Sequence, residues 1–325
     1  MSAHVAGSRV LVTGAGGFIG THLCARLGEQ GREVHAVSRQ EREPQALKEK
    51  GPQDGTVQWR RADLTDAAAV RSTLAAIKPD LIVHLASHVA GSRGLDLILP
   101  TFRANLLTTV NLLTAAAEVG CGRILLAGSM EEPGGDDPEA VPASPYAAAK
   151  WAARGYARMF HSLYQLPVVL LRIFMVYGPG QRDTTKLVPH VILSLLRGEG
   201  PRLGSGRREV DWIYVDDVID ALLAATRAPG IEGRTIDIGS GRLRSIRAVV
   251  EELVRLTGAS VEPLFGAIPD RPREPERIAD AAGTAAVLGW TSATSLEEGL
   301  ERTVAWYRAH LPEAAALPGG RVLRR

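Results

Sequence analysis

The sequence predicts an α/β fold, in which a doubly wound parallel sheet is followed by a smaller C-terminal α/β lobe. Two observations predict it. Short apolar runs alternate with longer amphipathic stretches through the first half of the chain, and strands separated by helices pair in parallel with right-handed crossovers. The strand-like runs are also apolar almost throughout, as in a sheet that helices cover on both faces.

The elements of the first half follow in order. Apolar runs predict six strands, at residues 9–13, 33–38, 57–61, 81–85, 124–127 and 168–174. Helical periodicity predicts helices at residues 18–29, 66–77, 97–119 and 145–166. Pro145 stands at the start of the last helix, where its missing N–H costs nothing.

The regular alternation of expected strands and helices ends after Gly178, where glycine and proline become frequent and the elements shorten. The runs at 210–215 and 235–238 read as strands that return to the main sheet. We therefore expect a first domain over residues 1–174, rejoined by residues 210–239, and a smaller lobe over residues 175–325. Three helices are expected in that lobe, at residues 187–197, 246–257 and 296–310.

Composition excludes several classes of protein. The chain has 325 residues, of which 45% are hydrophobic and 23% charged, as in ordinary globular proteins. A net charge of +2 without a basic block argues against nucleic acid as a partner. The longest apolar stretch, residues 166–178, is broken by Arg172 and is too short to span a bilayer, so we expect no membrane association and a cytoplasmic protein. No cluster of His, Cys, Asp and Glu has metal-ligand spacing, so no metal is expected.

A glycine-rich turn, TGAGGFIG, joins the first expected strand to the first expected helix. Gly14 permits a tight turn, Gly17 lets the backbone approach a pyrophosphate, and Gly20 lets the helix pack closely on the sheet. Phe18 and Ile19 open the helix, whose free N–H groups and positive dipole attract an anion. The turn therefore predicts a dinucleotide-binding site.

The end of the second strand indicates which dinucleotide is bound. An acidic residue there hydrogen-bonds the 2′-hydroxyl of NAD, whereas an arginine accommodates the 2′-phosphate of NADP. This chain has Ser38 and Arg39 at that place. A guanidinium binds a phosphate bidentately, so NADP(H) is the favoured cofactor and NAD(H) the alternative.

A tyrosine and a lysine, Tyr146 and Lys150, stand four residues apart on the expected helix at 145–166. This spacing puts both side chains on one face. A neighbouring ammonium lowers the pKa of a phenol, so the tyrosine becomes able to exchange a proton near neutral pH. Ser129 follows the fifth expected strand, which brings its hydroxyl to the carboxyl edge of the sheet, where ligands bind.

Together these motifs resemble the extended short-chain dehydrogenase/reductases, which have a Rossmann-type sheet. The family comprises NAD(P)-dependent nucleotide-sugar epimerases, dehydratases, decarboxylases and ketoreductases, and the resemblance implies a nucleotide-sugar substrate. It covers about residues 8 to 310. Besides the glycine-rich turn, Ser129 and YAAAK, it rests on Asp63-Leu64, His84-Leu85-Ala86-Ser87, Asn105, DWIYVDDVIDAL and RPREPERIADAAGTAAVLGW.

The resemblance implies a role for each matching residue. Tyr146 is expected to be the general acid/base, Lys150 to hold the nicotinamide ribose, and Ser129 to orient the sugar carbonyl or hydroxyl. Asp63 and Leu64 are expected to meet the adenine. Further cofactor contacts are expected from the segment after the fourth strand and from the long helix, at Leu85, Ala86, Ser87 and Asn105.

The reaction is predicted from the residues after Ser129. In the 4,6-dehydratases of this family an Asp-Glu pair follows the serine or threonine, and the acid protonates the leaving hydroxyl. Here Met130 replaces the aspartate, while Glu131 remains as an acid/base. With Arg39, this favours NADPH-dependent reduction of a nucleotide-activated 4-keto-6-deoxyhexose at C4. The alternative is an epimerase, 4,6-dehydratase or decarboxylase with tightly held NAD, and a scaffold protein without turnover is a third reading.

The substrate-binding positions depart from the family pattern. Met175 stands where members carry asparagine and Val210 where they carry arginine, two residues that contact the substrate diphosphate. The remaining candidates for substrate binding are His88, Ser129, Met130, Met175, Lys186, Arg208 and Arg271. The resemblance also implies a homodimer. Its twofold bundle is expected to use the YAAAK helix with its alanines and the long helix with Leu106, Leu107, Val110 and Leu113.

Overall fold

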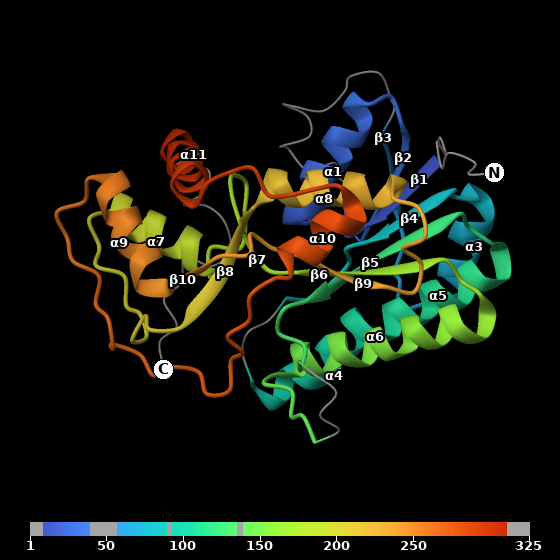
Figure 1. The fold of residues 1–325 in the computed structure, drawn as a ribbon, viewed down its shortest axis with the longest axis horizontal. Helices are drawn as coiled ribbons and strands as arrows, with labels where there is room; N and C mark the ends of the chain where they lie inside the picture. Colours follow the sequence, from blue (N-terminus) through green and yellow to red (C-terminus); the bar gives the residue numbers. More distant parts are fainter. Residues whose placement is uncertain (1–8, 40–56, 90–92, 135–138, 311–325) are drawn as a thin grey trace. The chain divides into compact units, whose positions relative to one another are not determined.

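The computed structural model describes residues 9–39, 57–89, 93–134 and 139–310 (Figure 1). The chain forms two compact units, each of which is described by itself. The first unit comprises Met1–Ile173, Ile219–Ile238 and Ala282–Trp290, and the second comprises Phe174–Val218, Gly239–Ala281 and Thr291–Arg325.

The first unit is built on a seven-stranded parallel sheet, so the predicted fold class is confirmed. The strand order is β3-β2-β1-β4-β5-β6-β9, and the carboxyl ends of parallel strands share one edge. The order reverses between β1 and β4, and such a switch point is where open α/β sheets bind ligands. The strands are β1 (Arg9–Thr13), β2 (Glu33–Ser38), β3 (Val57–Arg61), β4 (Leu81–His84), β5 (Arg123–Ser129), β6 (Val168–Ile173) and β9 (Thr235–Ile238).

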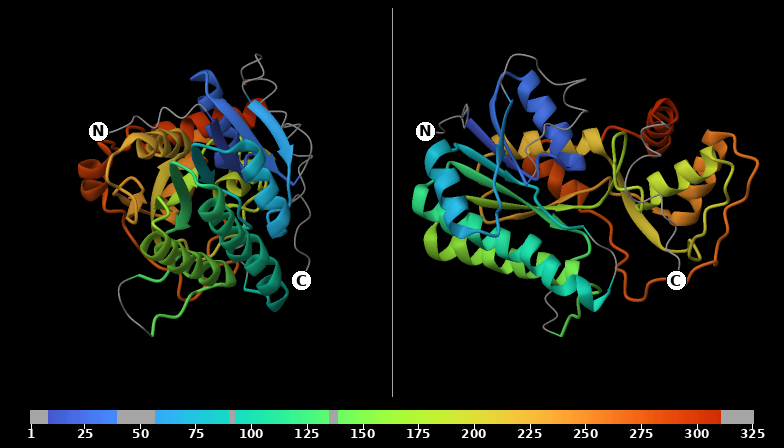
Figure 2. Two further views of the ribbon diagram at one scale, coloured as in Figure 1. Left: turned by 90° about the vertical axis from the view of Figure 1, so that its right-hand side faces the viewer. Right: turned by 180° about the vertical axis from the view of Figure 1, so that it is seen from behind.

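Helices cover both faces of this sheet (Figures 1 and 2). One face carries α3 (Ala67–Ile77), α5 (Thr108–Val119) and α6 (Pro145–Tyr164), and the other carries α1 (Phe18–Glu29) and α8 (Val215–Arg227). The core under the first three helices unites Leu74, Leu113 and Phe160 with Ile82 and Ile124 of the sheet. On the opposite face, the Arg26 guanidinium of α1 donates to Asp220 of α8 at 2.9 Å.

The long helix expected over residues 97–119 is interrupted in the structure. A 3₁₀ turn η1 (Leu95–Leu97), a short helix α4 (Ile98–Thr101) and a π-helical stretch η2 (Phe102–Leu107) precede α5. Thr108 and Thr109 each donate their hydroxyl to the carbonyl four residues earlier, at 2.8 and 2.7 Å. Apolar periodicity does not reveal this widening, because adding one residue to a turn leaves the apolar face nearly continuous.

The second unit has its own sheet, of order β10-β8-β7. Its strands are β7 (Met175–Tyr177), β8 (Glu209–Tyr214) and β10 (Leu243–Ser245), and its helices are α7 (Leu187–Leu196), α9 (Ile246–Thr257) and α11 (Leu296–Ala309). Residues 210–215 therefore do not return to the main sheet, which corrects that expectation. The place beside β6 is occupied by β9, with Leu170 paired to Thr235, while β8 pairs with β7 and β10.

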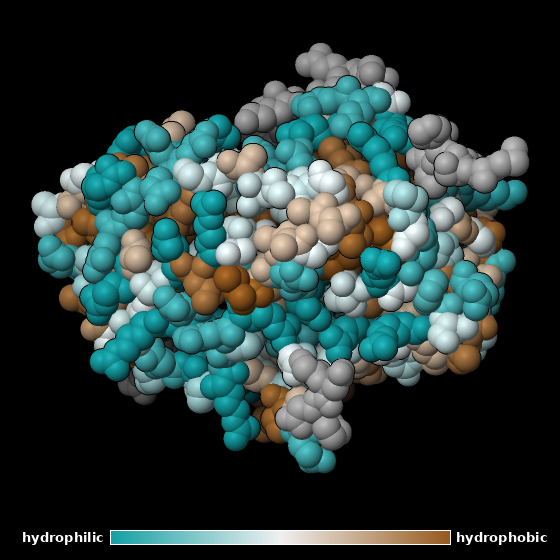
Figure 3. Space-filling view, in the orientation of Figure 1, coloured by the Kyte–Doolittle hydropathy of each residue, from teal (hydrophilic) through white to brown (hydrophobic). Residues whose placement is uncertain are grey.

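The surface seen in Figure 3 is mostly hydrophilic, with small apolar patches, and neutral to weakly hydrophobic residues lie over α10 (Ala281–Leu288). This helix is fixed to the first unit by Thr284, whose hydroxyl donates to the carbonyl of Asp237 at 2.7 Å. Across the described parts of the chain, no helix combines the length and the apolar character needed to cross a bilayer. The same residues contain no group of three or more His, Cys, Asp or Glu suited to a metal ion.

Candidate active site

The glycine-rich turn after β1 fits a dinucleotide. Gly14 has a φ of +68°, and a Cβ there would lie 2.6 Å from the backbone nitrogen of Ala86, so only glycine lets the turn approach the end of β4. Gly17 is the N-cap of α1 and provides no side-chain cap. The first N–H groups of the helix are thereby left for an anion such as a pyrophosphate.

Gly20 acts differently from the prediction. A Cβ at this position would lie 2.2 Å from the carbonyl oxygen of Gly14, so the glycine lets α1 close onto the turn itself rather than onto the sheet. Phe18 and Ile19, the other two predicted contacts, are partly exposed in the first turn of α1.

A buried histidine, His84, connects this turn to α5 through Thr109. His84 Nδ1 lies 2.7 Å from Thr13 Oγ1, and its Nε2 lies 3.1 Å from Thr109 Oγ1. Thr109 already donates its proton to the carbonyl of Asn105, so Nε2 carries the ring proton and Nδ1 accepts from Thr13. Burial lowers the pKa of His84 to about 3, which keeps the ring neutral.

Asn105 of η2 holds the segment after β4. Its Oδ1 accepts from the backbone N–H of His88 at 2.6 Å and from the Ser87 hydroxyl at 3.2 Å, and its Nδ2 donates to the carbonyl of His88 at 3.1 Å. Leu85 and Ala86 precede this clamp and are partly exposed. Among the described residues, the buried Nδ1 of His88 has no hydrogen-bond partner.

The structure brings Ser129, Tyr146 and Lys150 together at the carboxyl edge of the sheet. Ser129 ends β5, and Tyr146 and Lys150 lie in the first turns of α6, all three of them buried. The side chains of Ser129 and Ser87 act on the Tyr146 hydroxyl and favour its ionised form. Lys150 Nζ lies 6.0 Å from the centre of the Tyr146 ring and donates to the carbonyl of Ala127 at 2.8 Å.

The protonation states follow from this burial. Burial raises the pKa of Tyr146 to about 12, outweighing the opposite effect of Ser129 and Ser87, and Glu131 and Glu132 raise it further. The expected lowering by Lys150 is therefore not the dominant effect, and Tyr146 is a proton donor at neutral pH. Burial also lowers the pKa of Lys150 to about 8, although Glu132 opposes the shift. If a further positive charge binds beside Tyr146, in addition to the Lys150 ammonium, it favours the phenolate form of the tyrosine.

The three residues after Ser129 differ in exposure and in their contacts. Met130 is 2% exposed, so its predicted contact with substrate has no free surface in this structure. Glu131 is partly exposed, and its backbone N–H donates to Ser129 Oγ at 3.2 Å. Glu132 is buried and its carboxylate accepts from the backbone N–H of Ser129. Sequence reasoning missed Glu132, because a second acid beside Glu131 reads as a solvated charge.

The residues predicted to contact the adenosine part of the cofactor lie at the carboxyl ends of β2 and β3. Ser38 ends β2 and Arg39 follows it, exposed. Asp63 accepts from the backbone N–H and the hydroxyl of Thr65, which lower its pKa, and the charge of Arg39 lowers it further. Leu64 is buried. The Arg39 guanidinium therefore already has a carboxylate in its neighbourhood.

The predicted substrate residues of the second unit are partly committed to other contacts. Arg208 Nη1 donates to Glu274 at 2.8 Å and Arg271 Nη1 lies 3.5 Å from the same carboxylate. Lys186 Nζ lies 3.5 Å from Asp183. Met175 is partly exposed on β7, whereas Val210 on β8 is fully buried.

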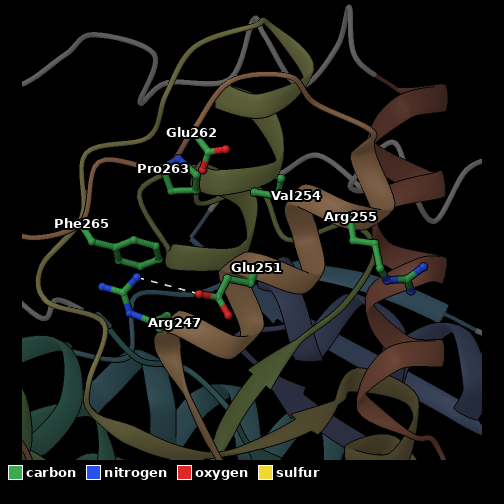
Figure 4. Close-up of a pocket in the computed structure, with 7 residues that line it drawn as sticks. All are labelled: Arg247, Glu251, Val254, Arg255, Glu262, Pro263 and Phe265. Atoms are coloured by element: carbon green, nitrogen blue, oxygen red, sulfur yellow. Dashed lines mark ion pairs between the residues drawn. The ribbon is translucent and has the colours of Figure 1, made fainter.

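A hollow of about 460 Å³ lies beside α9 in the second unit (Figure 4). The Arg247 guanidinium stacks 3.8 Å from the centre of the Phe265 ring and faces Glu251 at 3.9 Å. Arg255 pairs with Glu252 at 2.5 Å. The arginines are thus matched by neighbouring carboxylates, and none of the predicted site residues lines the hollow.

The sequence model of the NAD dependent epimerase/dehydratase family matches residues 10–239. The chain belongs to this family. The resemblance stated from the motifs is thereby confirmed, and the enzyme is of the extended short-chain dehydrogenase/reductase type. The matched residues include the glycine-rich turn, Ser129, Tyr146 and Lys150.

Known members of the epimerase/dehydratase family cover almost the whole chain. UDP-glucose 4-epimerase of Mycolicibacterium smegmatis is 32% identical over 314 residues, covering 92% of this chain and 98% of the relative. dTDP-glucose 4,6-dehydratase of Streptomyces griseus is 32% identical over 324 residues, covering 93% and 95%. The structure of UDP-glucuronic acid 4-epimerase from Bacillus cereus with UDP-glucuronic acid and NAD has a TM-score of 0.82 at 27% identity, covering 93% and 99%.

These comparisons bear on the predicted reaction and on the predicted cofactor. They favour the epimerase or dehydratase alternative over the 4-ketoreductase that the sequence favoured. They give no support to a preference for NADP(H), because the family is described as NAD dependent and the Bacillus cereus structure contains NAD.

Proposed function

We propose that the protein is a nucleotide-hexose 4-epimerase that works with an NAD held throughout turnover. The observation that carries the proposal is the turn after β5. Ser129, Tyr146 and Lys150 are together, but the buried thioether of Met130 stands where the resembling 4,6-dehydratases carry their acid. Oxidation and reduction at C4 need only the first three residues, whereas elimination of the C6 hydroxyl needs the acid as well.

The proposed roles follow from the chemistry of each residue. The free N–H groups of α1 and Lys150 hold the dinucleotide, which when bound supplies the hydride acceptor and donor. Ser129 Oγ accepts from the N–H of Glu131, and its hydroxyl would donate to the C4 oxygen. The phenolate form of Tyr146, which a bound cation beside the phenol would favour, would take the proton of the C4 hydroxyl during oxidation, and the resulting phenol would return it during reduction. The hexose must turn over between these steps for the configuration to invert.

The substrate class is a nucleotide diphosphate sugar, proposed with a changed diphosphate contact. Val210 and Met175 offer no charge to the phosphates, and Arg208 is paired with Glu274. The Arg271 side chain is 57% exposed, and its Nη1 lies 3.5 Å from the Glu274 carboxylate, a longer contact than that of Arg208. We therefore assign Arg271 as the diphosphate-binding residue of the second unit. Lys186, His88 and Met175 are the remaining candidates for contacts with substrate.

The cofactor prediction is that the purified protein carries NAD rather than NADP. Denaturation and chromatography should release close to one NAD per chain, and UDP-glucose, UDP-glucuronic acid or dTDP-glucose should be epimerised without added cofactor. Arg39→Ala should leave the NAD content unchanged, because the 2′-hydroxyl offers no charge to a guanidinium.

The reductase reading predicts the opposite behaviour. The protein would bind NADPH more tightly than NADH, and turnover would require NADPH in stoichiometric amount. A charge-assisted contact is worth about 1.5–3 kcal/mol, so Arg39→Ala would then weaken NADPH binding by roughly tenfold or more. Observation of this pattern would replace the epimerase by the 4-ketoreductase.

We also propose that the protein is a homodimer through α4, η2 and α6. Of the alanines predicted to face a partner on α6, Ala147, Ala149 and Ala153 are buried, while Ala148 is exposed and Ala152 partly exposed. On the other helix Leu113 is buried, whereas Leu106, Leu107 and Val110 are partly exposed. The large apolar side chains of α4, η2 and α6 that are exposed are Ile98, Leu99, Phe102, Tyr156, Leu163 and Tyr164. Surfaces of this kind mark interaction sites.

Light scattering at micromolar concentration should give twice the chain mass of 34.7 kDa. Leu163→Glu places a charge on the 66% exposed leucine of α6 and should shift the mass toward one chain. Ile268→Glu, at a 48% exposed residue of the second unit, is the matched control and should leave the mass unchanged. A wild-type protein of single-chain mass would contradict the proposed dimer.

A further inference from the structure

Glu132 holds the main chain of Ser129 at both ends. Its Oε1 accepts from the Ser129 N–H at 2.7 Å, and its own N–H donates to the Ser129 carbonyl at 3.2 Å. Ser129 lies beyond the last β4–β5 pair, His84 with Leu126. The carboxylate thus supplies a partner that β4 no longer provides, and the direction of the Ser129 side chain depends on it.

The space for this carboxylate is created by Gly128. A Cβ at position 128 would lie 2.7 Å from Glu132 Oε1. Glycine is needed here for a close approach and not for its backbone angle, because its φ is not positive. The position of the Glu132 carboxylate therefore depends on glycine at position 128.

The charges that face Glu132 come from two elements. Arg154 of α6 has its Nε 3.9 Å from Oε2, and the charges of Arg172 on β6 and Lys150 on α6 also act on the carboxylate. Arg172 is already bonded to Asp237 of β9 at 2.7 Å. Glu132 in turn favours the charged form of Lys150.

This carboxylate costs stability. Burial raises the pKa of Glu132 above its ordinary value, and the Ser129 N–H and the three cations only partly oppose the shift. A carboxyl group whose pKa is raised by folding destabilises the fold when ionised. The cost is present above the folded pKa and disappears as the pH falls below the unfolded value. A purely structural role does not explain a costly group beside Ser129 and Lys150.

We propose that Glu132 is a positioning residue of the active site: its carboxylate fixes the Ser129 main chain and places a negative charge near the Lys150 ammonium, which is bonded to Ala127 two residues before Ser129. The roles of Ser129 and Lys150 rest on the proposed function. Because Glu132 favours the Lys150 ammonium and disfavours the Tyr146 phenolate, it raises the pKa of both residues. Ser129, Glu131 and Ser87 also act on Tyr146, and His84 interacts with Lys150.

The test uses Glu132→Gln, which keeps an acceptor for the Ser129 N–H and removes the charge. Both limbs of the pH profile of kcat should move to lower pH, by roughly one pH unit for a single charge nearby. Glu232→Gln is the matched control, because it removes one carboxylate charge beside Arg123 at the opposite end of β5. An unmoved profile, or an equal shift in the control, would refute the role of this negative charge.

Thermal unfolding separates positioning from structure. Glu132→Gln should melt at or above the wild-type temperature at pH 7, with the difference closing toward pH 4 because the carboxyl group then becomes neutral in both states. Failure of this variant to fold, or a large fall in its melting temperature, would assign Glu132 a structural role and overturn the proposal.

Two further measurements do not require turnover. The affinity for NAD⁺ by titration calorimetry should weaken as Lys150 loses its proton, and in Glu132→Gln the weakening should begin at lower pH. Hydrogen exchange at the Ser129 amide should accelerate in Gly128→Ala, which displaces the carboxylate without removing its charge, and stay slow in Glu132→Gln. If the wild type epimerises no nucleotide hexose, the proposed function fails, while these two results still decide the role of Glu132. Unchanged exchange in Gly128→Ala would contradict it.

Discussion

Replacing Tyr146 by phenylalanine should lower kcat by about 10²–10⁴-fold, the range that general acid–base catalysis contributes. The variant removes one oxygen, and the ring of Tyr146 remains packed at 9% exposure, so the fold and the NAD content should be preserved. Ser129 and Ser87 both act on the hydroxyl that this variant removes. The measurement is the initial rate of C4 epimerisation, together with the NAD released on denaturation.

Tyr156→Phe is the matched control for this variant. It removes the same oxygen from the same helix, at a side chain that is 41% exposed, and should retain the wild-type rate. Wild-type turnover in Tyr146→Phe would show that the proton passes through another group.

Lys150→Met should lose both turnover and cofactor. Lys150 is buried, and its ammonium donates to the Ala127 carbonyl beside Tyr146. Hydrogen bonds made by a charged donor are worth about 1.5–3 kcal/mol, so the dissociation constant for NAD should rise by roughly tenfold or more. The rate should fall as well, because the phenolate form of Tyr146 then has no cation beside it.

The pH dependence of wild-type activity also tests the role of Lys150. Burial lowers the pKa of Lys150 to about 8, so the ammonium is present below that pH and is lost as the pH rises through it. Activity should therefore decline above about pH 8. Lys78→Met, at an exposed lysine that ends α3, should change neither the rate nor the NAD content. Retention of NAD by Lys150→Met would remove Lys150 from the cofactor site.

The main sheet and the placement of Ser129, Tyr146 and Lys150 were predictable from local pattern. Apolar runs predict the parallel strands, although β5 extends to Ser129, two residues beyond the end predicted for it. The carboxyl edge then collects the ends of all these strands. Tyr146 and Lys150 were placed on one face by helical spacing alone.

Other features depend on tertiary contacts that no local pattern contains. Residues 210–215 read as a strand, but which sheet a strand joins is decided by the edge available to it, and β9 occupies the edge beside β6. The π-helical η2 around Asn105 has the same apolar face as an α-helix. Glu132 reads as a surface charge, and only the fold shows that Gly128 leaves room for its carboxylate in the interior.

The fate of the hydrogen on C4 of the sugar tests the central claim most directly. A nucleotide hexose deuterated at C4 is incubated with the purified protein without added cofactor, and the product is examined by NMR. Oxidation and reduction at C4 with a retained NAD predict that the C4 epimer keeps its deuterium at C4. Deuterium at C6 of a 4-keto-6-deoxy product, deuterium lost to solvent, or turnover only with added NADPH would contradict the epimerase.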